Sequence, residues 1–195
     1  MKIVMNKAVK ITLWIAGILI AIILLLYFVV GPKLKEGTKK HSPEVTEQYS
    51  SNDQEIEVWY SSPAKKGRTI FGELVPYGEV WRTGANEATT FTTNKDLLID
   101  GQTLPAGKYT LWTIPGEETW QIIFNSEMYG WGVRWQDSKA TREEAYDVVV
   151  ATAKVSKSIS TKENFSIKIF EGPEKKPVLL LAWGQVVVPL PMEKK

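Results

Sequence analysis

The chain has 195 residues, with 24 basic and 22 acidic side chains, one histidine and no cysteine. Without cysteine, it has neither disulfides nor a lipid-modified N-terminal cysteine. Because His41 is the only histidine, the usual zinc ligand sets and a Ser-His-Asp triad are missing from the rest of the chain. No glycine-rich phosphate loop or dinucleotide fingerprint occurs, so the sequence predicts neither a metal site nor a cofactor.

The first uncharged segment covers residues 11–30, from Ile11 to Val30. As a helix, twenty residues span about 30 Å, the thickness of the hydrocarbon core of a bilayer. Trp14 and Tyr27 lie near its two ends, where aromatic rings favour the headgroup level. We therefore predict one transmembrane helix in contact with the lipid bilayer, after a short N-terminal tail of residues 1–10. The alternative is a cleaved signal peptide, but residues 28–32 (Phe-Val-Val-Gly-Pro) form a poor cleavage site.

Residues 31–43 are predicted to be a linker, because Gly, Pro, Lys, Thr and Ser dominate them. Lysines flank the apolar segment on both sides, so charge alone leaves the orientation open. Beyond this linker, residues 44–192 are predicted to form one domain. Residues 41–195 carry 17 basic and 21 acidic side chains, which argues against nucleic-acid binding.

The domain is rich in segments in which apolar and polar residues alternate, the pattern of half-buried strands. Gly- and Pro-rich turns separate these segments, and Gly184 interrupts the last of them, where a bulge or bend is expected. The pattern predicts an all-β fold: a single β-sandwich or jelly-roll-like domain behind one N-terminal transmembrane helix. A single helical turn is expected at 142–145. The predicted strands cover residues 55–60, 108–114, 120–125, 146–155, 165–169 and 178–190.

Residues 60–90 contain a long motif that is unusual for a plain β domain. The segment resembles the DUF2911 family of uncharacterised bacterial proteins, common in Bacteroidetes. The resemblance continues to about residue 170 and rests on Lys66-Gly67-Arg68, Ile70-Phe71-Gly72, Leu74-Val75-Pro76-Tyr77-Gly78 and the ten residues from Val80 to Thr89.

The family carries no established function, but many members look exported. The resemblance therefore implies that the domain is periplasmic or otherwise extracytoplasmic, and with the predicted helix we expect a single-pass membrane protein. The chain departs from the family pattern at Ser62, where an arginine is usual. If that arginine contacts a ligand, this chain binds the ligand differently or not at all.

The motif combines residue types that suit a polar ligand. Arg82 offers a planar fork of donors for a carboxylate or phosphate, and Asn86 offers both a donor and an acceptor. Each also has a structural interpretation: Arg82 could pair with Glu87, Asn86 could complete a turn, and Trp81 could be core. The candidate ligand-binding residues are Trp81, Arg82, Thr83, Asn86, Glu87, Lys66 and Arg68.

Three functions remain open from the sequence. The first is a binding module for a small polar ligand or an envelope glycan. The second is a structural or assembly protein that contacts another envelope protein. The third and weakest is a hydrolase that uses Glu87 as its acid/base. Trp131 and Trp135 are expected either to cap the core or to stack on a sugar or a partner protein.

Overall fold

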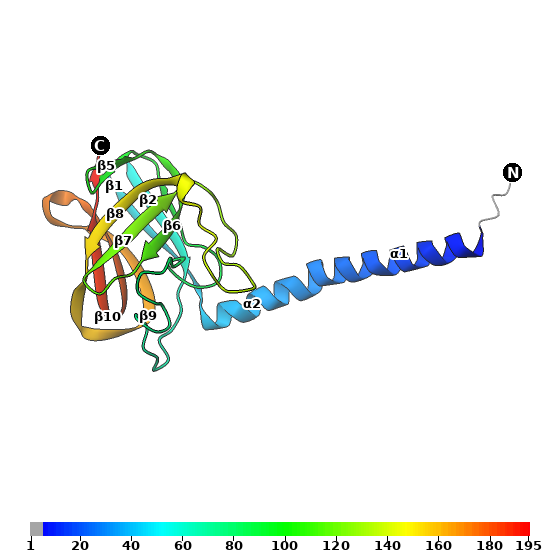
Figure 1. The fold of residues 1–195 in the computed structure, drawn as a ribbon. Helices are drawn as coiled ribbons and strands as arrows, with labels where there is room; N and C mark the ends of the chain where they lie inside the picture. Colours follow the sequence, from blue (N-terminus) through cyan, green and yellow to red (C-terminus); the bar gives the residue numbers. More distant parts are fainter. Residues whose placement is uncertain (1–5) are drawn as a thin grey trace. The chain divides into compact units, whose positions relative to one another are not determined.

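The structure is a computed structural model that describes residues 6–195 (Figure 1). The chain divides into two compact units, residues 1–40 and residues 41–195, which are described separately.

The N-terminal unit is helical. It comprises α1 (Lys7–Leu25), the π-helical turn η1 (Leu26–Val30) and α2 (Gly31–His41), which ends at the first residue of the second unit. The Asn6 side chain caps α1 by accepting a hydrogen bond from the Ala8 N–H at 3.2 Å. Residues Lys7–Val30 are long and apolar enough to cross a membrane, a property that a signal sequence shares.

Two sequence expectations differ from this helix. It begins at Lys7, inside the predicted tail, and it does not stop at Gly31-Pro32. The segment predicted to be a linker, residues 31–43, is helical from Gly31 to His41. The π turn η1 ends at Val30, just ahead of Gly31 and Pro32, and the helix continues as α2 although a proline lacks the N–H of a regular ladder.

The second unit is mostly β, as the alternating pattern predicted, and all its strand pairings are antiparallel. Its largest sheet has the order β1-β2-β3-β6-β7-β8. Four of these strands match predicted segments, whereas β1 and β3 were not predicted. The strands are β1 (Glu44–Ser51), β2 (Gln54–Ser61), β3 (Thr90–Thr93), β6 (Gly107–Ile114), β7 (Thr119–Asn125) and β8 (Asp147–Lys154).

Two smaller sheets complete the described strands. A long hairpin pairs β9 (Ser156–Glu171) with β10 (Pro177–Pro191) through the 3₁₀ turn η3 (Pro173–Lys175). The register shifts on both sides of Gly184, whose φ is 61°, so the irregularity expected there is present. The third sheet has the order β11-β4-β5 and consists of β11 (Glu193–Lys194), β4 (Leu97–Ile99) and β5 (Gln102–Leu104).

One hydrophobic cluster joins the six-stranded sheet to the β9–β10 hairpin. Burial alternates along β8 with the period of two expected for a strand that is covered on one face. The buried side chains Phe91, Leu111 and Phe124 of the sheet belong to the same cluster as Ile167 and Leu181 of the hairpin. This shared core fixes the hairpin relative to the sheet and positions the aromatic residues described next.

Candidate functional site

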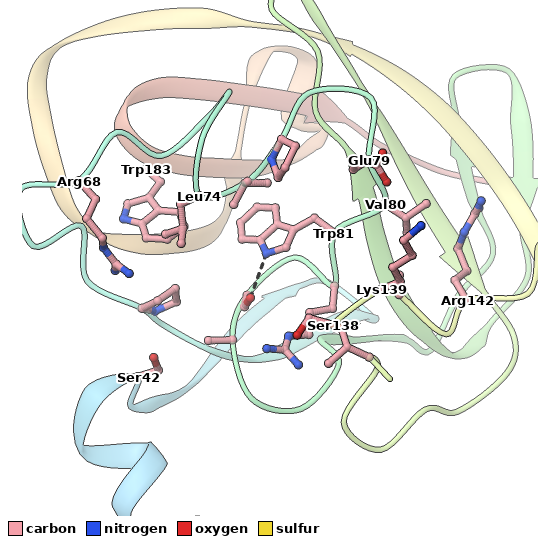
Figure 2. Close-up of a pocket in the computed structure, with 18 of the residues that line it drawn as sticks. Ser42, Arg68, Leu74, Glu79, Val80, Trp81, Ser138, Lys139, Arg142 and Trp183 are labelled. Atoms are coloured by element: carbon pink, nitrogen blue, oxygen red, sulfur yellow. Dashed lines mark hydrogen bonds between the residues drawn. The ribbon is translucent and has the colours of Figure 1, made fainter. Parts of the chain in front are cut away.

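A cavity of about 970 Å³ opens in the second unit (Figure 2). Its walls come from three parts of the chain: residues 41–85, which include most of the family-like motif, the loop from 133 to 144, and Trp183 of β10. The volume falls in the range of pockets that hold small molecules.

Two tryptophans, Trp81 and Trp183, form part of the apolar lining of the cavity. The Trp81 ring is stacked on Trp183 with 6.0 Å between centroids and 17° between planes. It also contacts Phe71, Trp120 and Phe165 edge-on, at centroid distances of 4.9 to 6.2 Å. Trp81 thus packs against the core and also lines the cavity. Its structural interpretation as a core residue and its interpretation as a ligand-binding candidate are therefore compatible.

Backbone contacts hold Trp81 in place. Its N–H donates to the Thr113 carbonyl at 2.7 Å, and the Thr113 N–H donates back at 2.9 Å, which attaches the motif to β6. The indole N–H donates to the Gly84 carbonyl at 3.0 Å. A Cβ on Gly84 would lie 2.9 Å from the Ser61 carbonyl oxygen, so this close approach of two backbones needs glycine.

The polar lining is strongly cationic. Six basic side chains line the cavity, against the two carboxylates Glu79 and Glu144. This excess contrasts with the acidic balance of residues 41–195 as a whole. A concave surface with one dominant sign of charge raises the local concentration of ligands of the opposite sign. The six are Lys66, Arg68, Arg82, Arg134, Lys139 and Arg142.

Arg82 is half-buried and is held by Trp131. Its Nη1 donates to the Trp131 carbonyl at 2.9 Å, and the guanidinium carbon lies 5.8 Å from the Trp131 ring centroid. Burial lowers the pKa of Arg82, and the nearby charge of Glu87 opposes that shift in part.

Trp131 also stacks on Trp135, with 5.6 Å between centroids and 18° between planes. The Trp135 residue is 81% exposed, so the expectation that it caps the core is wrong. The stack instead presents an indole face on the loop that forms one side of the cavity.

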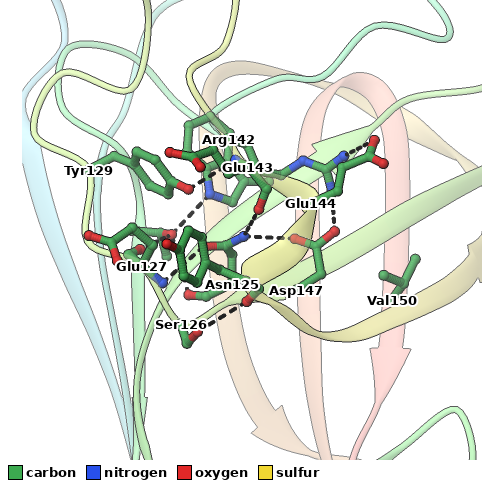
Figure 3. Close-up of polar contacts among 12 residues, drawn as sticks. Asn125, Ser126, Glu127, Tyr129, Arg142, Glu143, Glu144, Asp147 and Val150 are labelled. Carbon is green, nitrogen blue, oxygen red and sulfur yellow. Dashed lines mark hydrogen bonds and ion pairs between the residues drawn. The ribbon is translucent and has the colours of Figure 1, made fainter.

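Arg142 belongs to a polar network at the end of that loop (Figure 3). Its Nη1 donates to Asp147 at 2.6 Å and its Nη2 donates to Glu144 at 3.0 Å. The Arg142 side chain is only 4% exposed. Asn125 supports the network from β7 by donating to Asp147 at 2.8 Å and to the Glu143 carbonyl at 2.9 Å.

The loop is folded by local contacts around Asp137. Arg134 donates to both carboxylate oxygens of Asp137, at 3.1 and 2.6 Å. The backbone N–H of Lys139 donates to the same carboxylate at 3.1 Å. This N–H, together with Arg134, lowers the pKa of Asp137.

Four of the seven candidate residues line the cavity, namely Trp81, Arg82, Lys66 and Arg68. Lys66 and Arg68 are exposed, and Arg68 donates to the carbonyls of Ala64 and Lys65 at 2.6 and 3.0 Å. The motif thus brings an aromatic face and three basic side chains together, as a binding site would require.

The other three candidates do not line the cavity. Thr83 is fully buried, and its hydroxyl contacts the Trp81 carbonyl and the Thr113 hydroxyl at 3.3 and 3.2 Å. Asn86 is 8% exposed, has a φ of 58° and donates to the Ser42 carbonyl at 3.3 Å, so it bonds backbone of a distant segment and not of its own turn. Glu87 lies outside the lining and acts on it through its charge near Arg82.

Ser62, where the family pattern has arginine, is also structural in this chain. It is 5% exposed, and its hydroxyl donates to the Phe165 carbonyl of β9 at 2.6 Å. Its neighbours Pro63 and Ala64 line the cavity.

The lining from residues 133–144 and Trp183 was not predicted from the sequence. Trp183 lies far along the chain, and the loop residues have no motif of their own. The basic residues Arg134, Lys139 and Arg142 lie close together in one turn-rich segment, and this clustering was the sequence pattern that could have indicated a binding surface. The missed lining residues are Glu79, Arg134, Lys139, Arg142 and Trp183. Among residues 6–195, no three His, Asp or Glu side chains are grouped closely enough to hold a metal ion.

The comparisons with known proteins agree with the resemblance in the motif. A family model described as "Protein of unknown function (DUF2911)" matches residues 42–192, well over half of the chain. No curated protein and no solved structure matches the chain. The chain therefore belongs to the DUF2911 family.

Proposed function

We propose that this protein is a membrane-anchored, extracytoplasmic binding module that takes a small polar ligand, such as an envelope glycan fragment, in the cavity beside Trp81. The observation that carries the proposal is the lining itself, which joins indole faces to six basic side chains in one concave space. Aromatic faces stack on sugar rings, and arginine forks bind carboxylates or phosphates.

The anchor rests on the helix Lys7–Val30, which is long enough to span a bilayer. If the helix is retained, the mature protein keeps its first thirty residues; if it is a cleaved signal, the mature protein lacks them. We expect membrane fractions to hold the chain with its first thirty residues intact. Mass spectrometry of the protein purified from cells tests this, and a soluble form that lacks those residues would contradict the anchor.

We also propose that the domain is a β-sandwich in which the β9–β10 hairpin covers one face of the six-stranded sheet. The single core shared by Phe124, Ile167 and Leu181 supports this arrangement. A crystal structure in which these side chains do not pack together would refute it.

The binding role is tested by thermal-shift screening of the full chain in detergent with sugars and cell-wall fragments. At least one compound should raise the melting temperature, because a ligand that binds only the folded state stabilises it. Arg82→Ala should abolish that shift while the variant stays folded. The control is Lys154→Gln, a change to an exposed lysine of β8 outside the cavity lining, which should keep the full shift.

A structural or assembly role is the second candidate, and one observation favours it. Thr83 and Asn86 of the motif are buried and hydrogen-bonded inside the domain, as a purely structural motif would be. Under this role, Arg82→Ala would unfold the domain, no screened compound would shift the melting temperature, and crosslinking in membranes would capture another envelope protein. The proposal gives Glu87 no catalytic role, because this carboxylate does not line the cavity.

A further inference from the structure

One tryptophan of the second unit lies open to water. Among the tryptophans of residues 41–195, all of which the structure describes, Trp135 alone is exposed. One face of its ring stacks on the half-buried Trp131, with 18° between the ring planes. Since most of the Trp135 surface is accessible, the stack covers one face of the indole and leaves the other face available to a flat apolar group.

The loop holds this ring in a fixed place. Val133 pairs with Ala140 across the loop. The Arg134 N–H donates to the Lys139 carbonyl at 2.9 Å. The Asp137 carboxylate closes the turn by accepting from the Arg134 side chain and from the Lys139 N–H. Because the loop is ordered before a ligand arrives, binding to the stacked rings costs little conformational entropy.

The stacked rings lie at the edge of the cavity. Arg82 lines the cavity, and its guanidinium carbon is 5.8 Å from the Trp131 ring centroid. The Trp135 centroid lies a further 5.6 Å from that of Trp131. Arg134 and Ser138 of the same loop line the cavity, whereas the two stacked rings do not. The stack is therefore outside the cavity but within reach of a ligand that extends out of it.

The surroundings of Trp135 fit a sugar ring better than a protein surface. Its neighbours Arg134, Gln136 and Lys139 are polar and exposed. A stable protein interface buries about 800 Å² on each partner and has few charged residues at its centre. One indole among polar side chains offers no such area. A pyranose ring instead has an apolar C–H face that stacks on an indole and hydroxyl edges that bond to neighbouring polar groups.

We infer that the Trp131–Trp135 stack is a second binding subsite, outside the cavity, where Trp135 stacks on one ring of a glycan whose adjoining part occupies the cavity. This inference rests on the proposed binding function and specifies its ligand as a chain of linked sugars. Trp135 then distinguishes an oligosaccharide from a monosaccharide, because a single ring held in the cavity does not extend to the stack.

The experiment varies the length of one neutral glycan. Calorimetric titration of the full chain compares N-acetylglucosamine with its linear β-linked tetramer, in a detergent without a sugar headgroup. The tetramer should bind about tenfold more tightly, in keeping with one added aromatic stack. Both sugars are uncharged, so attraction to the basic lining of the cavity does not differ between them.

Two variants and a control locate the added ring. Trp135→Ala should weaken the tetramer to about the affinity of the monosaccharide and leave the monosaccharide unaffected. Trp135→Phe keeps an aromatic face and should retain most of the gain. The matched control is Ile159→Ala, which removes a fully exposed apolar side chain of β9 outside the cavity lining and should change neither affinity.

The possible failures are distinct. If the two sugars bind equally, or if Trp135→Ala weakens both alike, the stack is not a separate subsite; the inference is then wrong and the binding function stands. If neither sugar binds, the inference is also wrong. The binding function fails with it only if no compound in the thermal-shift screen binds either.

A bilayer is the other surface that an exposed indole favours. Proteoliposomes of phosphatidylcholine and phosphatidylglycerol with brominated chains test this, because bromine quenches indole fluorescence. Equal quenching of the unmodified protein and of Trp135→Phe is expected. Stronger quenching of the unmodified protein would assign Trp135 to the bilayer and refute the glycan subsite.

Discussion

Two segments form much of the cavity, and they are built in opposite ways. The motif segment, residues 81–89, is largely buried and tied to neighbouring strands by hydrogen bonds. The loop segment, residues 131–142, is largely exposed and is held by local ion pairs and turns. The loop segment contributes four polar side chains to the cavity lining (Arg134, Ser138, Lys139 and Arg142), whereas the motif segment contributes Arg82.

The largest expected difference in stability is between alanine variants of two tryptophans, Trp81 in the motif segment and Trp135 in the loop segment. Trp81→Ala removes a ring that packs on four other aromatic rings and donates to Gly84, so it should lower the free energy of unfolding by about 3 kcal/mol or more. Trp135→Ala removes a ring that is 81% exposed and should cost about 1 kcal/mol or less. Chemical denaturation of both variants measures the difference. Equal losses would show that the loop is part of the core.

Glycines give a second matched pair. Gly84→Ala brings a Cβ to 2.9 Å from the Ser61 carbonyl oxygen, so it should lower stability by about 1–3 kcal/mol. Gly130, just before the loop segment, has open space where a Cβ would stand, so Gly130→Ala should change stability by about 0.5 kcal/mol or less. Thermal and chemical unfolding would both report this, and a tolerated Gly84→Ala would show that the two backbones can separate.

Threonines test the hydrogen bonds of the two segments. Thr83→Val leaves the fully buried Thr113 hydroxyl without its contact at 3.2 Å, so it should cost about 1–2 kcal/mol. Thr141→Val changes a half-buried loop threonine and should be close to neutral. Urea denaturation compares the two variants. A neutral Thr83→Val would mean that the contact contributes nothing to stability.

The smallest effect concerns the charges that fold the loop. The Lys139 backbone N–H and Arg134 hold the pKa of Asp137 below its ordinary value of 3.8. Since the pKa is lower in the folded state, the contribution to stability is present above the ordinary Asp pKa and is lost as pH falls through the folded value. NMR titration of the Asp137 carboxyl should show a midpoint below 3.8, and Arg134→Gln should raise it. An unshifted midpoint would mean that the loop is not folded by this contact.

The parts of the structure that sequence predicted are those with a local signal. Alternation of polar and apolar residues predicted β2, β6, β7 and part of β9, whereas β8 was predicted from its Val, Ala and Thr residues and β10 from a long apolar stretch. The short strands β4, β5 and β11 have only two or three residues each, too few to show a period. The helix beyond Gly31 was missed because Gly31 and Pro32 are typical of a helix end. In the structure the helix already formed by the preceding apolar turns continues through them, since extending a helix is easier than starting one.

The same reasoning explains the outcome for the site. The motif includes part of the cavity lining, but residue type alone could not distinguish Arg82, which lines the cavity, from Asn86, which is buried and donates to the Ser42 carbonyl. Arg142 was missed because its ion pair with Asp147 of β8, and the support that Asp147 receives from Asn125 of β7, arise only in the folded domain. Contacts between residues that are far apart in the sequence leave no recognisable pattern in a short segment.

The stacked pair Trp81 and Trp183 has a consequence for how the domain is made. Trp183 stands on β10, about a hundred residues after Trp81, and it reaches the cavity only when the β9–β10 hairpin joins the shared core. Contacts so distant along the chain form late and slowly, because a long loop must close before they can stabilise anything. We therefore expect the stacked Trp81–Trp183 part of the cavity lining to form late in folding, after the hairpin has docked.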